Sequence, residues 1–364
     1  MSIGKNFLLT FVSVFTGIFA VGQSNSERDS KIASYLDTLS QKNFSGVILV
    51  AHNDQIIEKR AYGKANIEFN VENSIDTKFN IASISKLFTS VATLQLYEQN
   101  QLSLNTPIGE YLPDYPNKIV RDSVTVHQLL THTSGLNNFY VADLNKIKNL
   151  EYKKIADFVP LFVNDSLLSK PGTKYNYSAT GMVLLGLIIE ELSGISYYDY
   201  LKENIFEPAK MTNTTELEID SIVYNKASGY TSMFGENKIL SKNDYYLTKA
   251  SPAGFHYSTA EDLFNFSRAL KNHKLLKSEI TKLMFTPKVK GYNTHIGYGI
   301  DVDQRYNQTI LGHSGGWFGI HCELMDFMAD NYTIVILSNL DDSGKQGASQ
   351  VANFFKQLIA QKKT

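Results

Sequence analysis

The chain has a single cysteine, almost no net charge and no long apolar run after its first residues. Cys322 alone cannot form a disulfide within the chain, and its place in the apolar-rich segment GIHCELMDF favours a buried thiol over a reactive one. The 35 basic and 36 acidic side chains give a formal net charge of -1, which excludes the basic surface typical of nucleic-acid-binding proteins. We therefore expect no nucleic-acid partner and, apart from the N-terminus, no membrane span.

Signatures of metal binding, internal repeats and low-complexity linkers are also missing from the sequence. His127 and His132 lie five residues apart, but no third ligand or zinc-type spacing accompanies them. A structural role for the THTSG segment is therefore favoured over a metal site. We expect neither a metal ion nor an organic cofactor.

The first 22 residues have a composition of their own. They hold one positive charge at Lys5, the apolar stretch FLLTFVSVFTGIFAV, and the small residues Ala20 and Gly22 where a cleavage site requires them. This pattern predicts a cleavable signal peptide over residues 1–22 and a secreted or periplasmic mature protein. An uncleaved N-terminal anchor is the alternative.

Hydrophobic periodicity predicts strands at both ends of the chain and helices between them. Residues 45–63 contain two β-branched runs around Asn53 and Asp54, which is a hairpin signal. From Ser83 to about residue 285, apolar residues recur at spacings of three and four, as in amphipathic helices. Strand-like segments follow, and an amphipathic helix comes last: YGIDVDQ, QTILGH, WFGIHCELMDF, YTIVILSN and GASQVANFFKQLIAQ.

These elements predict an α+β fold in one domain that covers residues 23–364. The expected antiparallel sheet is built from both ends of the chain, about residues 40–75 and 292–362. Helices flank the sheet, and a mainly helical part is inserted over about residues 80–290.

The segment FNIASISK places Ser83 and Lys86 at the start of a predicted apolar helix. Residues at i and i+3 share a helix face, and the N-terminal end of a helix favours developing negative charge. A lysine beside a serine there can activate the hydroxyl as a nucleophile. Such pairs also arise by chance, as Ser2 and Lys5 show within the predicted signal peptide. An ordinary N-cap serine with a solvated lysine is the alternative, so the hypothesis needs further partners.

Two later segments offer such partners. PGTKYNYSATGMVLLG places Tyr177 just before a helix, where a phenol can reach inward from a loop. LGHSGGWFG presents four residues beside a predicted strand, with glycines that let a backbone N–H approach a ligand closely: His313, Ser314, Gly315 and Gly316. The single Trp317 that follows them either lines the cleft or packs in the interior.

Taken in order, the motifs FxIASxSK, LLTHTSGL, PGTxYxYSxxG and GHSGG resemble those of the class C β-lactamase family of serine hydrolases and penicillin-recognising enzymes. The resemblance spans roughly residues 40–358 and implies a β-lactamase/transpeptidase-like fold. It implies that Ser83 is the nucleophile, with Lys86 beside it and Tyr177 in the position of the base. His313 stands where many members have the lysine of a Lys-Thr-Gly motif.

The resemblance also implies how the reaction runs. Tyr177, as a tyrosinate or through Lys86, would take the serine proton. Because tyrosine and lysine both have an ordinary pKa near 10, we expect mutual stabilisation of anion and cation to lower at least one of them. The residues implied for the oxyanion hole and for substrate binding are Ser83, Ser314, Gly315 and Gly316, with the backbone N–H groups of the first and last holding the oxyanion.

One motif departs from the family pattern. Where relatives have Tyr-x-Asn, this chain reads Tyr177-Ser178-Ala179, so the amide that contacts an acylamino substrate is missing. Asn117, in the segment Tyr-Pro-Asn before LLTHTSGL, is out of order and is interpreted as coincidence. Asn137 or Asn138, after the THTSGL turn, is the candidate for a replacement amide donor.

The implied function is a secreted serine hydrolase that acts through a Ser83 acyl-enzyme on esters or on peptide and amide bonds. Because the motif amide is missing, we favour an esterase or D-amino-acid peptidase with weak β-lactamase activity at most. The alternatives are a penicillin-binding sensor that captures cell-wall fragments and deacylates slowly, and an efficient β-lactamase. The partner expected in each case is a small-molecule or peptide substrate.

Overall fold

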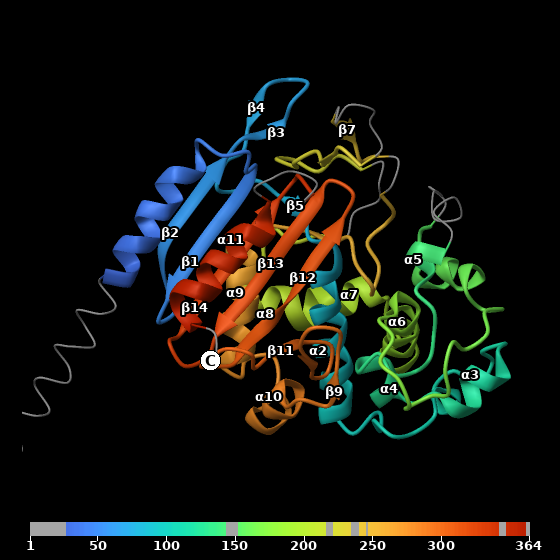
Figure 1. Ribbon diagram of the computed structural model, residues 1–364. Helices are drawn as coiled ribbons and strands as arrows, with labels where there is room; N and C mark the ends of the chain where they lie inside the picture. The colour runs from blue at the N-terminus through green and yellow to red at the C-terminus, as the bar shows by residue number, and fades with distance from the viewer. Residues whose placement is uncertain are drawn as a thin grey trace, which may run out of the picture.

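The computed structural model describes residues 27–142, 152–215, 221–233, 240–244, 247–341 and 347–361. The predicted signal peptide lies outside these residues. Figure 1 shows a central sheet with helices packed against it and a large helical part to one side. This arrangement confirms the predicted α+β class and the mainly antiparallel sheet.

The sheet has eight strands, and its order joins the two ends of the chain. β1 pairs along its whole length with β14, so that Gly46 lies opposite Ser338 and His52 opposite Tyr332. The order is β2-β1-β14-β13-β12-β11-β10-β9. The strands are β1 (Gly46–His52), β2 (Gln55–Tyr62), β9 (Val289–Lys290), β10 (His295–Ile296), β11 (Asp301–Asp303), β12 (Ile310–Trp317), β13 (Ile320–Phe327) and β14 (Tyr332–Ser338).

The hairpin that opens the sheet is the one the sequence predicts. Asn53 and Asp54 connect β1 to β2 with φ angles of 51° and 61°. Two successive positive φ values are typical of the type I′ turn, which matches the twist of the strands it joins. The three hairpin-connected strands β12, β13 and β14 then bring the second half of the sheet beside the first.

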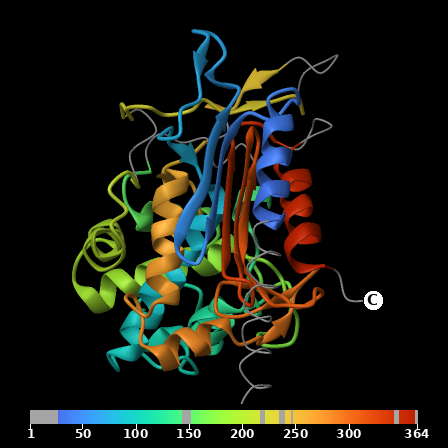
Figure 2. The ribbon, with the colours of Figure 1, turned by 90° about the vertical axis from the view of Figure 1, so that its left-hand side faces the viewer.

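Two hydrophobic cores lie on opposite faces of the sheet. On one face, helix 27–39 and α11 (Ala348–Phe355), continued by the π-helical turn η7 (Lys356–Ala360), run side by side (Figure 2). Tyr35 and Phe354 stack between these helices with ring centroids 3.6 Å apart. The larger core lies on the other face, where the inserted helices pack against alternate residues of β12, β13 and β14.

The inserted helices surround α2 (Lys86–Glu98) and α6 (Ala179–Ser193), which are the most deeply buried of those described. Gly194 ends α6 with a φ of 71°, a left-handed conformation that suits glycine. The other helices are α3 (Lys118–Ser123), α4 (Val126–Leu130), α5 (Phe139–Ala142), α7 (Tyr197–Leu201), α8 (Glu207–Ala209), α9 (Ala260–Lys271) and α10 (Ser278–Phe285), with short 3-10 turns η1 (Ala82–Ser85), η2 (Ile108–Glu110) and η3 (Ile155–Leu161) and the π-helical turn η4 (Lys202–Phe206).

Three two-stranded ladders complete the described structure: β3 (Lys64–Asn66) with β4 (Val71–Glu72), β5 (Phe79–Asn80) with β8 (Tyr257–Ser258), and β6 (Tyr230–Thr231) with β7 (Ser241–Lys242). The β5–β8 ladder matters most for the site, because it ties the chain just before η1 to the loop of residues 251–256.

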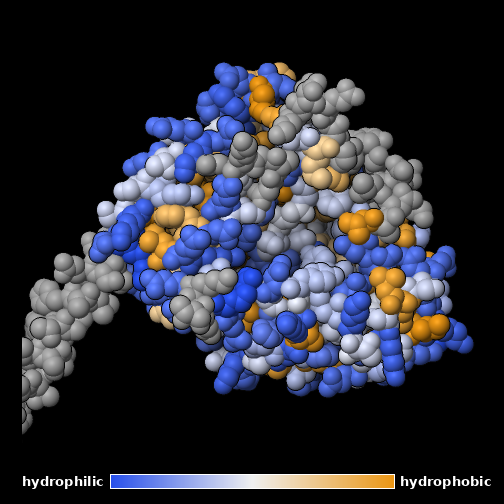
Figure 3. All heavy atoms as spheres, viewed as in Figure 1, coloured by the Kyte–Doolittle hydropathy of each residue, from blue (hydrophilic) through white to orange (hydrophobic). Residues whose placement is uncertain are grey.

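Figure 3 shows hydrophilic residues over most of one face, with hydrophobic residues in small separate groups. Within the described residues, no single helix is long and apolar enough to cross a membrane; α6 with the segment Tyr197–Ala209 reaches that length only as a pair bent by 84°. Cys322 is fully buried, as predicted, and burial raises the pKa of its thiol to about 12.

Candidate active site

Ser83 lies in the short 3-10 turn η1, between β5 and α2. In a 3-10 turn the side chains at i and i+3 eclipse each other. Lys86, the first residue of α2, accordingly donates from Nζ to Ser83 Oγ over 3.0 Å. We expected Ser83 at the helix N-terminus; it precedes the helix instead, and Ser85 occupies the N-cap position.

The turn that carries Ser83 is held in an uncommon conformation. Ala82 has a φ of 42°, which costs free energy for a residue with a Cβ atom. Its N–H donates to Asn80 Oδ1 over 3.0 Å, and its carbonyl accepts from the Phe255 N–H over 3.2 Å. Phe255 itself has a φ of 76°. The loop of residues 251–256 therefore fixes the backbone on which Ser83 sits.

Lys86 is buried to 1 % exposure, with its amino group directed at two oxygens. Besides Ser83 Oγ, Nζ donates to the carbonyl oxygen of Ala253. Burial lowers the pKa of Lys86 to about 7, because the charged form loses its hydration. A substantial neutral fraction is thus present near neutral pH, as a general base requires.

Tyr177 faces the same pair from the chain segment before α6. Its ring centroid lies 4.9 Å from Lys86 Nζ. Burial raises the pKa of the Tyr177 phenol, and a hydrogen bond with Ser83 opposes that rise only in part. Our expectation that anion and cation stabilise each other is wrong in its cause: burial alone lowers the pKa of Lys86, and Tyr177 shifts in the direction that keeps it protonated.

The glycines of β12 bring this strand against the serine turn. A Cβ added to Gly315 would lie 2.3 Å from the Ile81 carbonyl oxygen and 3.3 Å from the Ser83 nitrogen. A Cβ added to Gly316 would meet no heavy atom within 4 Å. Gly315 is therefore required for the close approach, and Gly316 faces open space beside Ser83.

His313 is buried next to Ser314 in the same strand. Its Nδ1 donates to the Ser314 carbonyl oxygen over 2.5 Å, and its ring centroid lies 6.4 Å from that of Tyr177. Burial lowers the pKa of His313, while the nearby Asp301 carboxylate opposes the shift. Burial in turn raises the pKa of Asp301. A neutral imidazole therefore lines the site near neutral pH.

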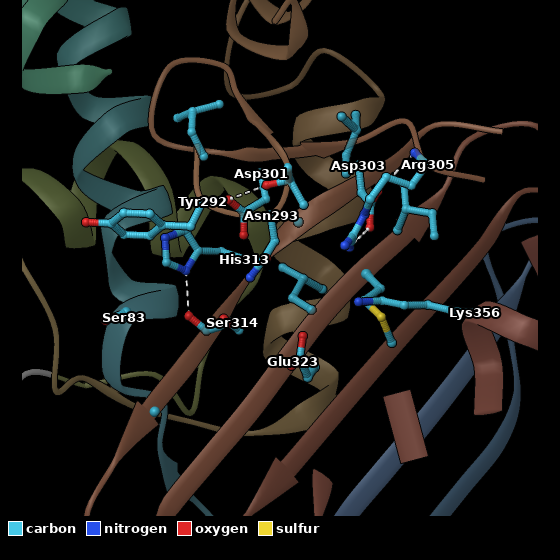
Figure 4. Close-up of a pocket in the computed structure, with 18 of the residues that line it drawn as sticks. Ser83, Tyr292, Asn293, Asp301, Asp303, Arg305, His313, Ser314, Glu323 and Lys356 are labelled. Atoms are coloured by element: carbon cyan, nitrogen blue, oxygen red, sulfur yellow. Dashed lines mark hydrogen bonds and ion pairs between the residues drawn. The ribbon is translucent and has the colours of Figure 1, made fainter. Parts of the chain in front are cut away.

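A cavity of about 450 Å³ opens at Ser83 and extends along β12 (Figure 4). Of the seven residues named for the site, all except Lys86 and Gly315 line it, together with residues that the sequence pattern does not single out. These additional lining residues include Tyr175, Tyr292, Asn293, Asp301, Asp303, Arg305, Glu323 and Lys356. Tyr175 stands two residues before Tyr177, which is the one local signal that could have indicated it.

The remaining sequence candidates have other partners. His127 Nδ1 shares a hydrogen bond of 2.9 Å with the Tyr298 hydroxyl, whereas His132 Nδ1 accepts from the Ser178 N–H. Among the described residues, no group of three or more His, Cys, Asp or Glu could hold a metal ion. Trp317 packs on aromatic rings, 5.7 Å from the centroid of Phe255.

The structure also places Asn117, interpreted as coincidence, and the two candidate replacement donors Asn137 and Asn138. Asn117 caps α3 through the Val120 N–H. Asn137 donates its amide to Asp165 over 3.2 Å and accepts from the Asn138 N–H, which argues against it as the substrate donor. The Oδ1 atom of Asn138 is buried and has no hydrogen-bond partner.

The chain is similar to known proteins in both sequence and structure. The family model described as "Beta-lactamase" matches residues 29–354. "Putative penicillin-binding protein PbpX" of Bacillus subtilis (strain 168) is 31 % identical over 341 residues, which is 92 % of this chain and 79 % of the relative. The penicillin-binding protein from Bacillus halodurans has a TM-score of 0.80 at 30 % identity, covering 89 % of this chain and 98 % of that one.

A third similarity concerns the fold alone. The structure of EstCE1, described as a hydrolase with promiscuous acyltransferase activity, has a TM-score of 0.76 at 19 % identity. It covers 93 % of this chain and 99 % of that chain.

Proposed function

This chain belongs to the beta-lactamase family and is a serine hydrolase, and on that premise we propose that Ser83 forms an acyl-enzyme with esters or with peptide and amide bonds. The observation that carries the proposal is the hydrogen bond of 3.0 Å from the buried Lys86 amine to Ser83 Oγ. A nucleophile hydrogen-bonded to a base of lowered pKa is the arrangement that covalent catalysis requires.

The proposed reaction uses neutral Lys86 as the base. Its amine takes the proton of Ser83 Oγ while the oxygen attacks the substrate carbonyl carbon. The backbone N–H groups of Ser83 and Gly316 stabilise the oxyanion. Tyr177, a phenol in the resting enzyme, donates its proton to the leaving group, and the protonated Lys86 then returns a proton to the phenolate. Water then attacks the acyl carbonyl carbon while neutral Lys86 takes its proton. The ester bond to Ser83 breaks, and Oγ receives that proton from Lys86.

We favour esters and D-amino-acid peptides over β-lactams as substrates. Ala179 stands where relatives hold the amide that donates to an acylamino carbonyl, and Asn137 is engaged with Asp165. A simple ester has no acylamino carbonyl and loses nothing from this replacement. The mature protein is proposed to act outside the cytoplasm, because residues 1–22 have the pattern of a signal peptide.

A fluorophosphonate probe tests the nucleophile directly. We expect labelling of the peptide that contains Ser83, and loss of both labelling and turnover in Ser83→Ala. Label on any other serine would contradict the assignment. The substrate class is tested in parallel with p-nitrophenyl esters, D-alanyl peptides and a chromogenic cephalosporin, with Ser83→Ala as the blank for each.

A sensor that binds penicillin and deacylates slowly is the second candidate, favoured by the similarity to proteins named as penicillin-binding. Intact-mass spectrometry after mixing with a penicillin distinguishes the two. A penicilloyl adduct that persists for hours, with no ester or peptide turnover, supports the sensor. Rapid turnover of esters or peptides supports the hydrolase.

A further inference from the structure

His132 lies in the turn after α4, within the LLTHTSGL segment, and has no place in the reaction proposed above. It is buried to 2 % exposure and has a φ of 55°. A positive φ in a residue with a Cβ atom persists only where surrounding contacts hold it. Those contacts involve the segment that carries Tyr177.

His132 accepts two hydrogen bonds, one from the residue on each side of Tyr177. The His132 carbonyl oxygen accepts from the Asn176 N–H over 2.7 Å. Its Nδ1 accepts from the Ser178 N–H over 3.3 Å. Between these two bonds the imidazole packs on the phenol, with ring centroids 4.7 Å apart.

We propose that His132 is a positioning residue that fixes the Tyr177 phenol relative to Ser83 and Lys86. The inference rests on the catalytic role proposed for Tyr177. Because Nδ1 accepts a hydrogen bond, the ring proton must be on Nε2. One residue thus restrains the tyrosine backbone through its own carbonyl and side chain, and the ring through direct contact.

The Nδ1 acceptor is available at neutral pH. Burial, with a smaller contribution from the charge of Lys86, lowers the pKa of His132 to about 3. The imidazole therefore keeps the Nδ1 lone pair that the Ser178 N–H needs. His132 does not serve as a proton carrier in this role, and its effect on the reaction passes through Tyr177.

The neighbouring turn supports the same segment with two further bonds. Asn176 Nδ2 donates to the Leu136 carbonyl oxygen over 2.8 Å, and Ser178 Oγ donates to the Asn137 carbonyl oxygen over 2.7 Å. Because these bonds remain in a His132 variant, the segment should stay folded while the phenol gains freedom. A displacement of about 1 Å in a catalytic group can lower the rate about 100-fold.

Three variants separate positioning from folding. In His132→Asn, Oδ1 stands at the same number of bonds from Cα as Nδ1, and asparagine tolerates a positive φ. In His132→Gln the oxygen is one bond farther away, and in His132→Leu no acceptor remains. We expect kcat for an alkyl ester, whose alkoxide leaving group requires a proton, to fall about 100-fold in the Gln and Leu variants. The Asn variant should recover most of that loss, with KM little changed throughout.

A double-mutant cycle with Tyr177→Phe supplies the second readout. His132→Gln should cause little further loss of kcat once the phenol is gone, because it acts through that group. Thermal unfolding of each variant accompanies the kinetics. If Tyr177→Phe keeps near-normal kcat, the proposed role of Tyr177 fails, and the inference with it.

Other outcomes would overturn the inference about His132 and leave the proposed role of Tyr177 intact. In the first, Tyr177→Phe is inactive but His132→Asn and His132→Gln have equal kcat. In the second, the losses of kcat caused by His132→Gln and Tyr177→Phe multiply in the double variant, so the two residues act independently. A Gln variant that fails to fold where the Asn variant folds would also overturn it, because the side chain would then be required by the fold.

Discussion

At the scale of single residues, the burial of Lys86 lowers the stability of the fold and also provides the base for the reaction. A charged amine is destabilised by burial, and the shift of its pKa to about 7 expresses that cost. The same shift supplies the neutral amine that the reaction needs near neutral pH. Stability and activity therefore respond to pH through one group, in ways that can be measured separately.

For activity, we expect kcat/KM to rise with pH through an apparent pKa of about 7. The neutral amine accepts the serine proton, so protonation of Lys86 below this pH removes the base. A pH–rate profile of ester hydrolysis checks this, since kcat/KM reports groups of the free enzyme. A profile that stays flat from pH 5 to 9 would remove Lys86 from that role.

For stability, we compare the melting temperatures of Lys86→Met and the wild type. We expect the difference to shift in favour of the variant as the pH falls. The folded-state pKa of about 7 lies below the ordinary lysine value of 10.5, so the unfolded state binds more protons between these values. Wild-type stability therefore falls as the pH decreases from 10.5 to 7 and levels off below. Melting curves of both proteins across this range test the trend; the lost hydrogen bonds add only an offset independent of pH. A constant difference would contradict the buried charge.

Ala179 gives a prediction about specificity. We expect the wild type to hydrolyse short-chain esters more efficiently than cephalosporins, and Ala179→Asn to narrow the gap. A hydrogen bond to a charged group contributes about 1.5–3 kcal/mol, which limits the gain to about ten- to a hundred-fold. Ala179→Leu has a similar shape without the amide and is the matched control. Equal gains in both variants, or a wild type that prefers cephalosporins, would refute the prediction.

At the scale of elements, the approach of β12 to η1 forms the site, and adjacent glycines allow a direct test. Gly315→Ala should lower the melting temperature and the activity, because its methyl group would lie 2.3 Å from the Ile81 carbonyl oxygen. Overpacking of this kind typically costs about 1–3 kcal/mol. Gly316→Ala meets open space and should leave the melting temperature unchanged. Equal melting temperatures would mean that the strand is not in such close contact.

The elements also show which features a sequence pattern can predict. The hairpin at Asn53 and Asp54 depends on neighbouring residues, and the spacing of Ser83 and Lys86 within one turn brings their side chains together. Those expectations are confirmed. The strained conformation of Ala82 depends on Phe255, far along the chain, and no local pattern encodes that contact.

The same limit applies to the cavity. Tyr292 and Asp301 line it together with Ser83 because the sheet places β11 and the turn between β9 and β10 beyond β12, not because of any motif around them. A buried Lys86 of reduced pKa could be anticipated from its place beside a serine, but not its second contact, the carbonyl oxygen of Ala253, which lies far along the chain. The motif residues are therefore predictable, and the rest of the binding surface is not.

At the scale of the whole molecule, the proposal of export makes a prediction about the mature chain. Mass spectrometry of the exported protein should show an N-terminus at or near Gln23, because the small residues Ala20 and Gly22 mark the cleavage region. Protein retained in the cytoplasm serves as the uncleaved reference. An exported chain of full length would support the membrane anchor instead.

The pairing of β1 with β14 has a consequence for when the protein can fold. β1 is synthesised early, but the strand that covers its other edge begins only at Tyr332. Contacts so distant along the chain slow folding, and the first strands present an unpaired edge until the last ones arrive. The sheet is therefore completed only after nearly all of the polypeptide has been made. The interval before the sheet closes is therefore the period in which the chain is most prone to aggregate. If the chain is exported as proposed, the same delay leaves it extended for passage through a translocation channel.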